Sequence, residues 1–191
     1  DIIINLHHFA NQIIKFVEEH NYFNCRIVFS DESGELLETG GGLKKASWFL
    51  ETGGAFIVRN VDVLSDLRLD KLIEYHSENN ALATLAVRDR PTSRYFLFQE
   101  DWRLAGWENR RTGQKILAGE ESVRLNGLVI PDLFPMAFSG IQVLEPEIFP
   151  LITEQGSFSL TNLYLRLAES QRIYGFPETG TLWKDIGTAG H

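Results

Sequence analysis

Apolar positions in the first half of the chain alternate between short apolar runs and helical spacings. Residues 2–6 form an apolar run typical of a strand covered on both faces, and Phe9, Ile13 and Phe16 follow at helical spacing. The same alternation predicts strands over residues 25–30, 55–60 and 81–87, and helices over residues 42–50 and 69–76. This β-α-β-α order favours an α/β fold with a mixed, mostly parallel sheet and helices on both faces.

The second half of the chain contains shorter, aromatic-rich segments. Residues 95–99 and 103–107 flank the turn-like pair Glu100 and Asp101, which predicts a hairpin. Residues 111–135 carry little pattern and are expected to form a long loop or an insertion. A strand is predicted over residues 137–144, a helix over 158–168, and short strands over 172–176 and 181–183. No repeat or linker divides the chain, so residues 1–191 are predicted to be a single domain.

The composition narrows the class of protein. With 191 residues, 43% of them hydrophobic, the chain is long enough to bury one sizeable core. A net charge of −8 at pH 7 argues against a nucleic-acid surface, which needs a basic stripe. The single cysteine excludes a disulfide framework, and no apolar stretch reaches the roughly 20 residues of a membrane span. A reduced, cytoplasmic protein without a nucleic-acid or membrane partner is expected.

Residues 38–42 form the most informative motif, an acid and a hydroxyl followed by three glycines. Glycine has no Cβ, so a turn built from it adopts positive φ easily and lets the backbone approach a ligand. The helix predicted behind the turn would offer unpaired N–H groups to acceptors on that ligand. Two interpretations are open: a flexible turn in which glycine caps the helix, or a cradle for a flat or charged ligand.

Two carboxylates follow predicted strands. Asp62 comes after the strand over residues 55–60, and Asp185 comes after the strand over residues 181–183. Ligands of an open parallel sheet bind outside the carboxyl ends of its strands, and Mg²⁺ takes one or two carboxylates together with phosphate oxygens. Each aspartate is also compatible with an ordinary turn or helix cap, and Asp66 competes with Asp62. As metal ligands, Asp62 and Asp185 would converge on one cation.

Two further features have both a structural and a functional interpretation. Gly140 interrupts a well-formed strand, which marks either packing against a neighbour or the close approach of a bound sugar hydroxyl. Arg88, Arg90 and Arg94 follow another strand and form a basic cluster in which a phosphate contact is conceivable. For these arginines we favour a solvated loop, because no sequence feature fixes their side chains toward a site.

The order and spacing of these motifs over nearly the whole chain resemble the sugar-phosphate nucleotidylyltransferases. The likeness is greatest to the bacterial branch of mannose-1-phosphate guanylyltransferases and N-acetylmuramate-1-phosphate uridylyltransferases. The resemblance implies the Rossmann-like nucleotide-diphospho-sugar transferase fold of that family. It also implies that Gly41 and Gly42 lie along the nucleobase, with Glu38 and Thr39 shaping the pocket.

The resemblance further implies the chemistry. Asp62 and Asp185 would be the catalytic Mg²⁺ ligands, and Gly140 would contact the sugar through its backbone. The implied reaction joins an NTP and a sugar 1-phosphate into an NDP-sugar and pyrophosphate. The sugar phosphate oxygen would attack the α-phosphorus in line while Mg²⁺ neutralises the developing charge, without a covalent enzyme intermediate.

One departure from the family concerns the sugar and phosphate side of the pocket. Glu108 occupies a position where the family often has a Glu-Lys pair facing sugar and phosphate. Asn109 stands in the place of the lysine, and Arg110 follows it. The resemblance therefore implies Glu108 and Asn109 as sugar-binding residues, while the lysine that would contact the phosphate is missing.

A second departure is an absence. The opening strand of the family, its Gly-x-Gly-x-Arg phosphate loop and the following Pro-Lys have no counterpart, which implies a domain without its first βα unit and cut near its C-terminus. Because that loop holds the triphosphate, a chain without it is expected to be weakly active or inactive. Two alternatives stay open, a metal-dependent glycosyltransferase of the same fold and a non-catalytic fragment that binds nucleotide-sugar. A sheet without that strand could also pair with a second copy of the chain.

Overall fold

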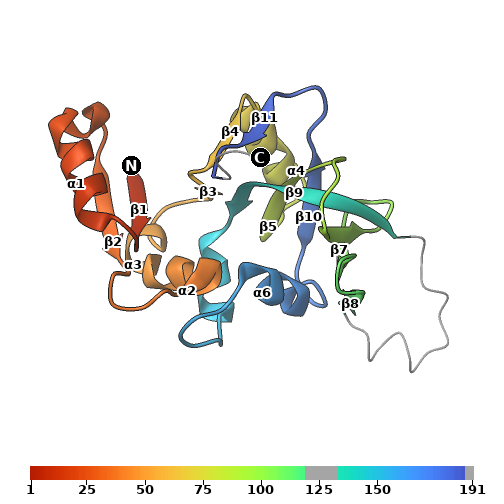
Figure 1. Ribbon diagram of the computed structural model, residues 1–191. Helices are drawn as coiled ribbons and strands as arrows, with labels where there is room; N and C mark the ends of the chain where they lie inside the picture. Colours follow the sequence, from red (N-terminus) through yellow and green to blue (C-terminus); the bar gives the residue numbers. More distant parts are fainter. Residues whose placement is uncertain (119–132, 188–191) are drawn as a thin grey trace. The chain divides into compact units, whose positions relative to one another are not determined.

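The structure is a computed structural model, and it describes residues 1–118 and 133–187 (Figure 1). The chain divides into two compact units. The first unit contains residues 1–54 and 146–163, and the second contains residues 55–145 and 164–191. The single domain predicted over residues 1–191 stays a prediction. No described helix combines the length and the apolar character needed to span a bilayer.

The first unit contains a pair of parallel strands. β1 (Ile2–Leu6) pairs with β2 (Ile27–Asp31) along its whole length. Leu6 is buried but Ile2 is 44% exposed, so the prediction that the first strand is covered on both faces is wrong for the described residues. The other elements of the unit are α1 (Ala10–Glu19), η1 (Asn21–Asn24), α2 (Glu38–Lys45), α3 (Ser47–Leu50), η2 (Pro146–Leu151) and the first half of α6 (Leu160–Leu167).

The three glycines lie inside a helix. The sequence predicted a turn over residues 38–42 and a helix from residue 42, whereas α2 begins at Glu38 and contains every glycine of the motif. Within the motif only Glu38 has a positive φ, of 55°. The N–H groups of Gly40 and Gly41 both donate to the carbonyl of Phe158, at 2.8 and 3.3 Å. These bonds satisfy donors at the start of the helix and offset the weak helix propensity of glycine.

The second unit contains a seven-stranded mixed sheet built on the long strand β9 (Phe134–Leu144). β3 (Phe56–Arg59) and β5 (Ala83–Arg88) both pair with β9 in antiparallel orientation, and β10 (Ile173–Pro177) pairs with β5 in parallel. The sheet is mixed, as predicted, but the prediction that it is mostly parallel is wrong for the described strands, because β10 and β5 form its only described parallel pair.

The hairpin predicted from the aromatic segments is confirmed. β6 (Arg94–Phe98) pairs with β7 (Leu104–Asn109) in antiparallel orientation, and β6 also pairs with the first residues of β9. The sequence missed β8 (Gln114–Leu117), which pairs with β7 inside the segment expected to be a loop. A four-residue strand carries too little alternation to be recognised from its sequence. Residues 119–132 of the predicted loop lie outside the described residues.

The strand directions bring three carboxyl ends to one edge of this sheet. β3 and β5 are each antiparallel to β9, so they run in the same direction, and β10 runs parallel to β5. Their last residues are Arg59, Arg88 and Pro177. In α/β proteins, ligands bind outside the carboxyl ends of such strands. We call this part of the second unit the carboxyl edge.

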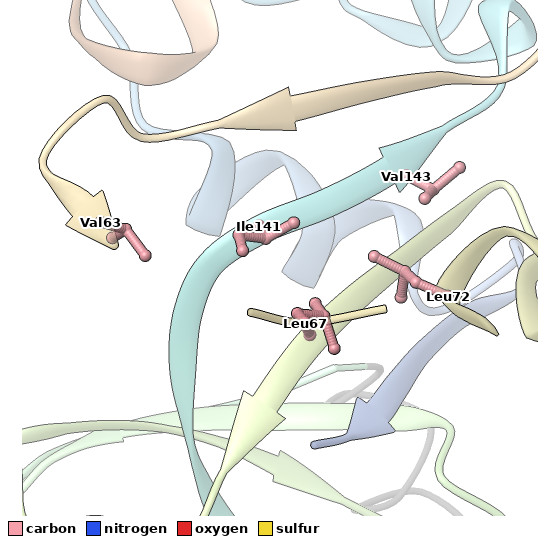
Figure 2. Close-up of a cluster of buried hydrophobic side chains, with 6 residues drawn as sticks. Val63, Leu67, Leu72, Ile141 and Val143 are labelled. Atoms are coloured by element: carbon pink, nitrogen blue, oxygen red, sulfur yellow. The ribbon is translucent and has the colours of Figure 1, made fainter. Parts of the chain in front are cut away.

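A buried apolar cluster supports the carboxyl edge. It consists of Val63, Leu67, Leu72, Ala86, Ile141 and Val143. Figure 2 shows Ile141 and Val143 on β9, with Val63, Leu67 and Leu72 around them. These side chains come from β4 (Val63–Ser65), α4 (Leu69–Glu78), β5, β9 and the segment before α4. Burying each large apolar side chain contributes about 1.5–3 kcal/mol, so the cluster holds these elements in place.

Candidate functional site

Asp62 lies in the turn that joins β3 to β4. The N–H of Asn60 donates to the carbonyl of Gly140 (2.8 Å), and the carbonyl of Asn60 accepts from the N–H of Val63 (3.3 Å). These two bonds fix the backbone on both sides of Asp62, whose side chain is exposed. The turn therefore presents a carboxylate to solvent at the carboxyl end of β3.

Asp185 reaches the same turn from the far end of the sequence. It ends β11 (Trp183–Asp185), which pairs with β4 in antiparallel orientation and lies beside it in Figure 1. The N–H of Ile186 donates to the carbonyl of Asp62 (2.8 Å), and the N–H of Gly187 donates to Asp185 Oδ1 (3.0 Å). A Cβ on Gly187 would lie 2.5 Å from Asp62 Oδ2, so a larger residue would displace that carboxylate. One glycine thus lies against both predicted metal ligands.

Gly140 packs against the turn that carries Asp62. Its φ of +79° lies in the left-handed region that favours glycine, and the register of β5 and β9 shifts beside it, between Leu85 and Val87. A Cβ at this position would lie 2.8 Å from Val63 Cγ2. Packing against a neighbour therefore explains the glycine in this strand, and the predicted contact of Gly140 with a sugar stays a prediction.

Two arginines at the carboxyl edge stack on one indole ring. The guanidinium carbon of Arg90 lies 4.3 Å from the ring centroid of Trp183, and that of Arg88 lies 5.5 Å from it. Arg90 Nη2 donates to the carbonyl of Phe138 (3.2 Å), and Arg88 Nη2 donates to the carbonyl of Thr181 (3.0 Å). Both side chains are half-buried. The solvated loop expected from the sequence is therefore wrong for Arg88 and Arg90.

Trp183 links these arginines to Asp185. Its indole N–H donates to the carbonyl of Ser139 (2.8 Å), and its ring packs against the buried cluster. Trp183 and Asp185 are two residues apart on a strand, so their side chains share one face. Burial lowers the pKa of Arg90, the charge of Arg88 lowers it further, and Asp185 opposes both effects. A tryptophan two residues before Asp185 was the sequence signal that could have revealed this arrangement.

Glu108 and Asn109 lie at the end of β7 and make contacts within their own hairpin. Glu108 Oε1 accepts from Arg110 Nε (2.7 Å), and the Arg110 guanidinium stacks over Tyr95 at 4.3 Å. Asn109 is buried, and its Oδ1 accepts from the N–H of Arg111 (3.0 Å) in the turn toward β8. No described contact joins either residue to Asp62 or Asp185, so their sugar-binding role stays a prediction.

The predicted nucleotide residues belong to the first unit, at the start of α2. Glu38 and Thr39 are exposed. Thr39 Oγ1 nevertheless accepts from the N–H of Leu160 (3.1 Å), which caps the first turn of α6. The hydroxyl that was expected to shape a nucleobase pocket therefore joins two segments of the unit.

The glycines of α2 leave room for protein neighbours. A Cβ on Gly41 would lie 2.4 Å from the carbonyl oxygen of Gly156, and one on Gly42 would lie 2.6 Å from Asn5 Nδ2 and 2.8 Å from Glu32 Oε1. Such distances are too short for any side chain. Close packing thus accounts for both glycines without a ligand, and their placement along a nucleobase stays a prediction.

Sequence comparison finds relatives that match almost all of the chain. An N-acetylmuramate alpha-1-phosphate uridylyltransferase of Caulobacter vibrioides is 28% identical over 97% of this chain and 72% of its own length. A UTP--glucose-1-phosphate uridylyltransferase of Synechocystis is 26% identical, and a mannose-1-phosphate guanyltransferase of Yarrowia lipolytica is 27% identical. These two matches cover 97% and 98% of this chain but 48% of each relative.

The chain is a homologue of the sugar-phosphate nucleotidylyltransferases. The resemblance described from its motifs is thereby confirmed. No family model matches the chain. This nucleotidylyltransferase homologue spans about three quarters of the Caulobacter relative and about half of the other two.

Comparison of structures confirms the fold of the nucleotidylyltransferase homologue. HddC from Yersinia pseudotuberculosis complexed with GMP-PN has a TM-score of 0.72 at 21% identity, over 98% of this chain and 73% of that structure. A putative glucose-1-phosphate thymidylyltransferase from Bacillus anthracis has a TM-score of 0.70 at 13% identity, over 99% of this chain and 72% of that structure. The chain therefore has the nucleotide-diphospho-sugar transferase fold predicted from its sequence.

The donor set of the nucleotidylyltransferase homologue is compatible with Mg²⁺. Across residues 1–118 and 133–187 there is no group of three or more His, Cys, Asp or Glu side chains arranged to hold a metal. Mg²⁺ does not require one, because it keeps several waters and uses one or two carboxylates with substrate phosphates. Asp62 and Asp185 fit this requirement, since both are exposed and both lie against Gly187.

Proposed function

We propose that this chain supplies the metal side, the sugar side and the nucleobase side of a sugar-1-phosphate nucleotidylyltransferase. The reaction would convert an NTP and a sugar 1-phosphate into an NDP-sugar and pyrophosphate. The observation that carries the proposal is the convergence of Asp62 and Asp185 at Gly187, in a homologue of such enzymes. The cytoplasmic location expected from the sequence is part of this proposal.

In this mechanism Asp62 and Asp185 hold Mg²⁺, which when bound neutralises charge on the reacting phosphoryl group. Their backbones are fixed by the bond from the N–H of Ile186 to Asp62 and by the pairing of β4 with β11. Fixed carboxylates lose little freedom when they bind a cation, and this preorganisation contributes to catalysis. No side chain needs to act as a nucleophile.

The nucleotide side of the proposal rests on the start of α2. Glu38 and Thr39 are exposed there, and Gly41 and Gly42 keep the helix backbone free of side chains. A backbone without side chains suits the flat face of a base, while the N–H groups of Gly40 and Gly41 are already used by the carbonyl of Phe158. We assign these four residues to the nucleobase on that basis.

The test is an assay of pyrophosphate release. The chain is incubated with Mg²⁺, with UTP or GTP, and with N-acetylmuramate 1-phosphate, mannose 1-phosphate or glucose 1-phosphate. We expect release that requires Mg²⁺ and at least one of these sugar phosphates. It should be lost in the double variant Asp62→Asn, Asp185→Asn and kept in Asp70→Asn, because Asp70 is an exposed acid paired with Arg68. Equal release by the double variant would contradict the metal assignment. Transfer of sugar from an NDP-sugar without pyrophosphate would identify a glycosyltransferase instead.

A further inference from the structure

Arg88 and Arg90 are two like charges held close together. Both lie against the ring of Trp183, at 5.5 and 4.3 Å from its centroid. Neither takes part in an ion pair among the described residues, whereas Arg68 and Arg110 each pair with a carboxylate. Like charges repel more strongly where burial removes water from between them. An anion close to both guanidinium groups would relieve this repulsion.

The two arginines retain donors for such an anion. A guanidinium has five N–H donors in a planar fork, which matches the oxygens of a phosphate. The described bonds of Arg88 and Arg90 to backbone carbonyls use Nη2 of Arg88 and both Nη atoms of Arg90, and each Nη carries two hydrogens. Arg90 Nε is buried without a hydrogen-bond partner among the described residues. The pair is therefore held firmly in place but is not saturated with acceptors.

The position of Arg88 and Arg90 in the fold indicates which anion they would bind. Arg88 ends β5 at the carboxyl edge and Arg90 follows the strand, and Trp183 shares a strand face with Asp185. Asn109 replaces the lysine that the family would direct at phosphate, and its Oδ1 is used in the turn to β8. A phosphate that approaches a metal on Asp62 and Asp185 needs a further source of positive charge in a chain of net charge −8.

We propose that Arg88 and Arg90, held against Trp183, bind the phosphate of the sugar 1-phosphate at the carboxyl edge. The assignment rests on the proposed function, because it takes the sugar 1-phosphate as the substrate. It assigns a phosphate to two residues of the basic cluster for which the sequence favoured a solvated loop. The bonds to the carbonyls of Phe138 and Thr181 fix the two guanidinium groups, and both groups contact the ring of Trp183.

The experiment measures binding and does not depend on turnover. Calorimetric titrations with N-acetylmuramate 1-phosphate, mannose 1-phosphate and glucose 1-phosphate are compared with a titration of inorganic pyrophosphate, all in Mg²⁺. The variants are the double change Arg88→Gln, Arg90→Gln and the conservative double change Arg88→Lys, Arg90→Lys. The control is Arg68→Gln, which alters an exposed arginine that precedes α4 and pairs with Asp70.

We expect the glutamine double variant to bind the preferred sugar phosphate at least about 10-fold more weakly, as loss of charge-assisted bonds implies. Pyrophosphate binding should change by less than about 3-fold. The lysine variant keeps both charges and should recover part of the affinity even if the glutamine variant is unstable. The control should match the unaltered chain.

Unchanged sugar-phosphate affinity in both double variants would overturn the proposal. So would a loss confined to pyrophosphate, because the anion would then come from the nucleotide. Failure of the proposed function is recognised separately. A chain that binds a sugar phosphate through these arginines but never releases pyrophosphate supports the phosphate site and counts against the reaction.

Discussion

The glycine helix α2 of the first unit and the carboxyl edge of the second contain the two clearest motifs of the sequence, but their residues are used differently. In α2, Gly41 makes room for the carbonyl of Gly156 and Thr39 caps α6. At the carboxyl edge, Asp62 and Asp185 stay exposed while the backbone around them is fixed. Residues that folding already requires are weak evidence for a ligand, whereas Asp62 and Asp185 keep exposed carboxylates of which one oxygen of Asp185 is used, by the N–H of Gly187.

The largest effect we expect separates activity from stability at the carboxyl edge. Asp62→Asn or Asp185→Asn should lower kcat by roughly 100-fold or more, as the loss of one electrostatic contact in a preorganised site typically does. The unfolding temperature should stay within about 2 °C, because surface substitutions usually change stability by less than 0.5 kcal/mol. Pyrophosphate release and thermal unfolding are measured on the same samples. If a variant lost stability and activity together, these aspartates would be needed for folding, like the residues of α2.

The opposite behaviour is expected in the glycine helix. Gly41→Ala places a Cβ 2.4 Å from the Gly156 carbonyl oxygen, and a backbone atom cannot move aside cheaply. Overpacking of this kind costs about 1–3 kcal/mol of unfolding free energy. The matched control is Gly34→Ala, where a Cβ meets nothing within 4 Å. Urea unfolding compares the two variants. Equal stabilities would show that packing does not explain the glycine, and a ligand contact would become the better explanation.

A smaller effect is expected for the hydroxyl of the same motif. Thr39→Val removes the acceptor for the N–H of Leu160 and should cost about 1 kcal/mol of unfolding free energy. Thr52→Val, at an exposed threonine of the same unit, serves as the control. Affinity for UTP and GTP is measured beside stability. A change in nucleotide affinity without a change in stability would make Thr39 part of the nucleobase pocket and weaken the contrast drawn above.

The smallest effect concerns pH and the interior of the second unit. His76 is buried on α4, with Nδ1 2.8 Å from Thr84 Oγ1 and Nε2 3.3 Å from Glu145 Oε1. Burial lowers its pKa from the ordinary value of 6.5, and Glu145 opposes that decrease. The neutral form is therefore favoured in the folded chain, so its contribution to stability is complete above pH 6.5 and is lost as pH falls from there toward the lowered pKa.

The check is the slope of unfolding free energy against pH between pH 7.5 and 5.5. One histidine contributes at most about 1.4 kcal/mol per pH unit to that slope. His76→Gln should have a shallower slope than the unaltered chain. An unchanged slope in His76→Gln would contradict this assignment of the pH dependence.

Most elements of the fold could be predicted from the sequence. A buried strand or helix face requires apolar residues at regular spacing within its own segment, so the pattern can be recognised there. The helix over residues 69–76 and the buried strand over residues 81–87 are confirmed as α4 and β5. The start of α2 was placed four residues late, because the glycines of this helix are stabilised by the carbonyl of Phe158, which is distant in sequence. Local propensity contains no information about such a partner.

The candidate site, like the fold, could be predicted only in part from the sequence. The pairing of Asp62 with Asp185 was expected because both follow strands, and the structure places them against one glycine. The fixed positions of Arg88 and Arg90 were missed, because they depend on contacts with Trp183, which lies more than 90 residues later in the chain. A basic cluster after a strand is normally solvated, and only the tertiary stack distinguishes this one.

Binding of Mn²⁺, in place of Mg²⁺, tests most directly whether Asp62 and Asp185 hold one divalent cation. Electron paramagnetic resonance counts the free ion while the chain is titrated in the presence of pyrophosphate, since such sites complete their coordination with phosphate oxygens. We expect one site per chain, absent from the double variant Asp62→Asn, Asp185→Asn and retained in Asp70→Asn. Binding of Mn²⁺ by the double variant with unchanged stoichiometry and affinity would contradict the assignment of the carboxyl edge as the metal site.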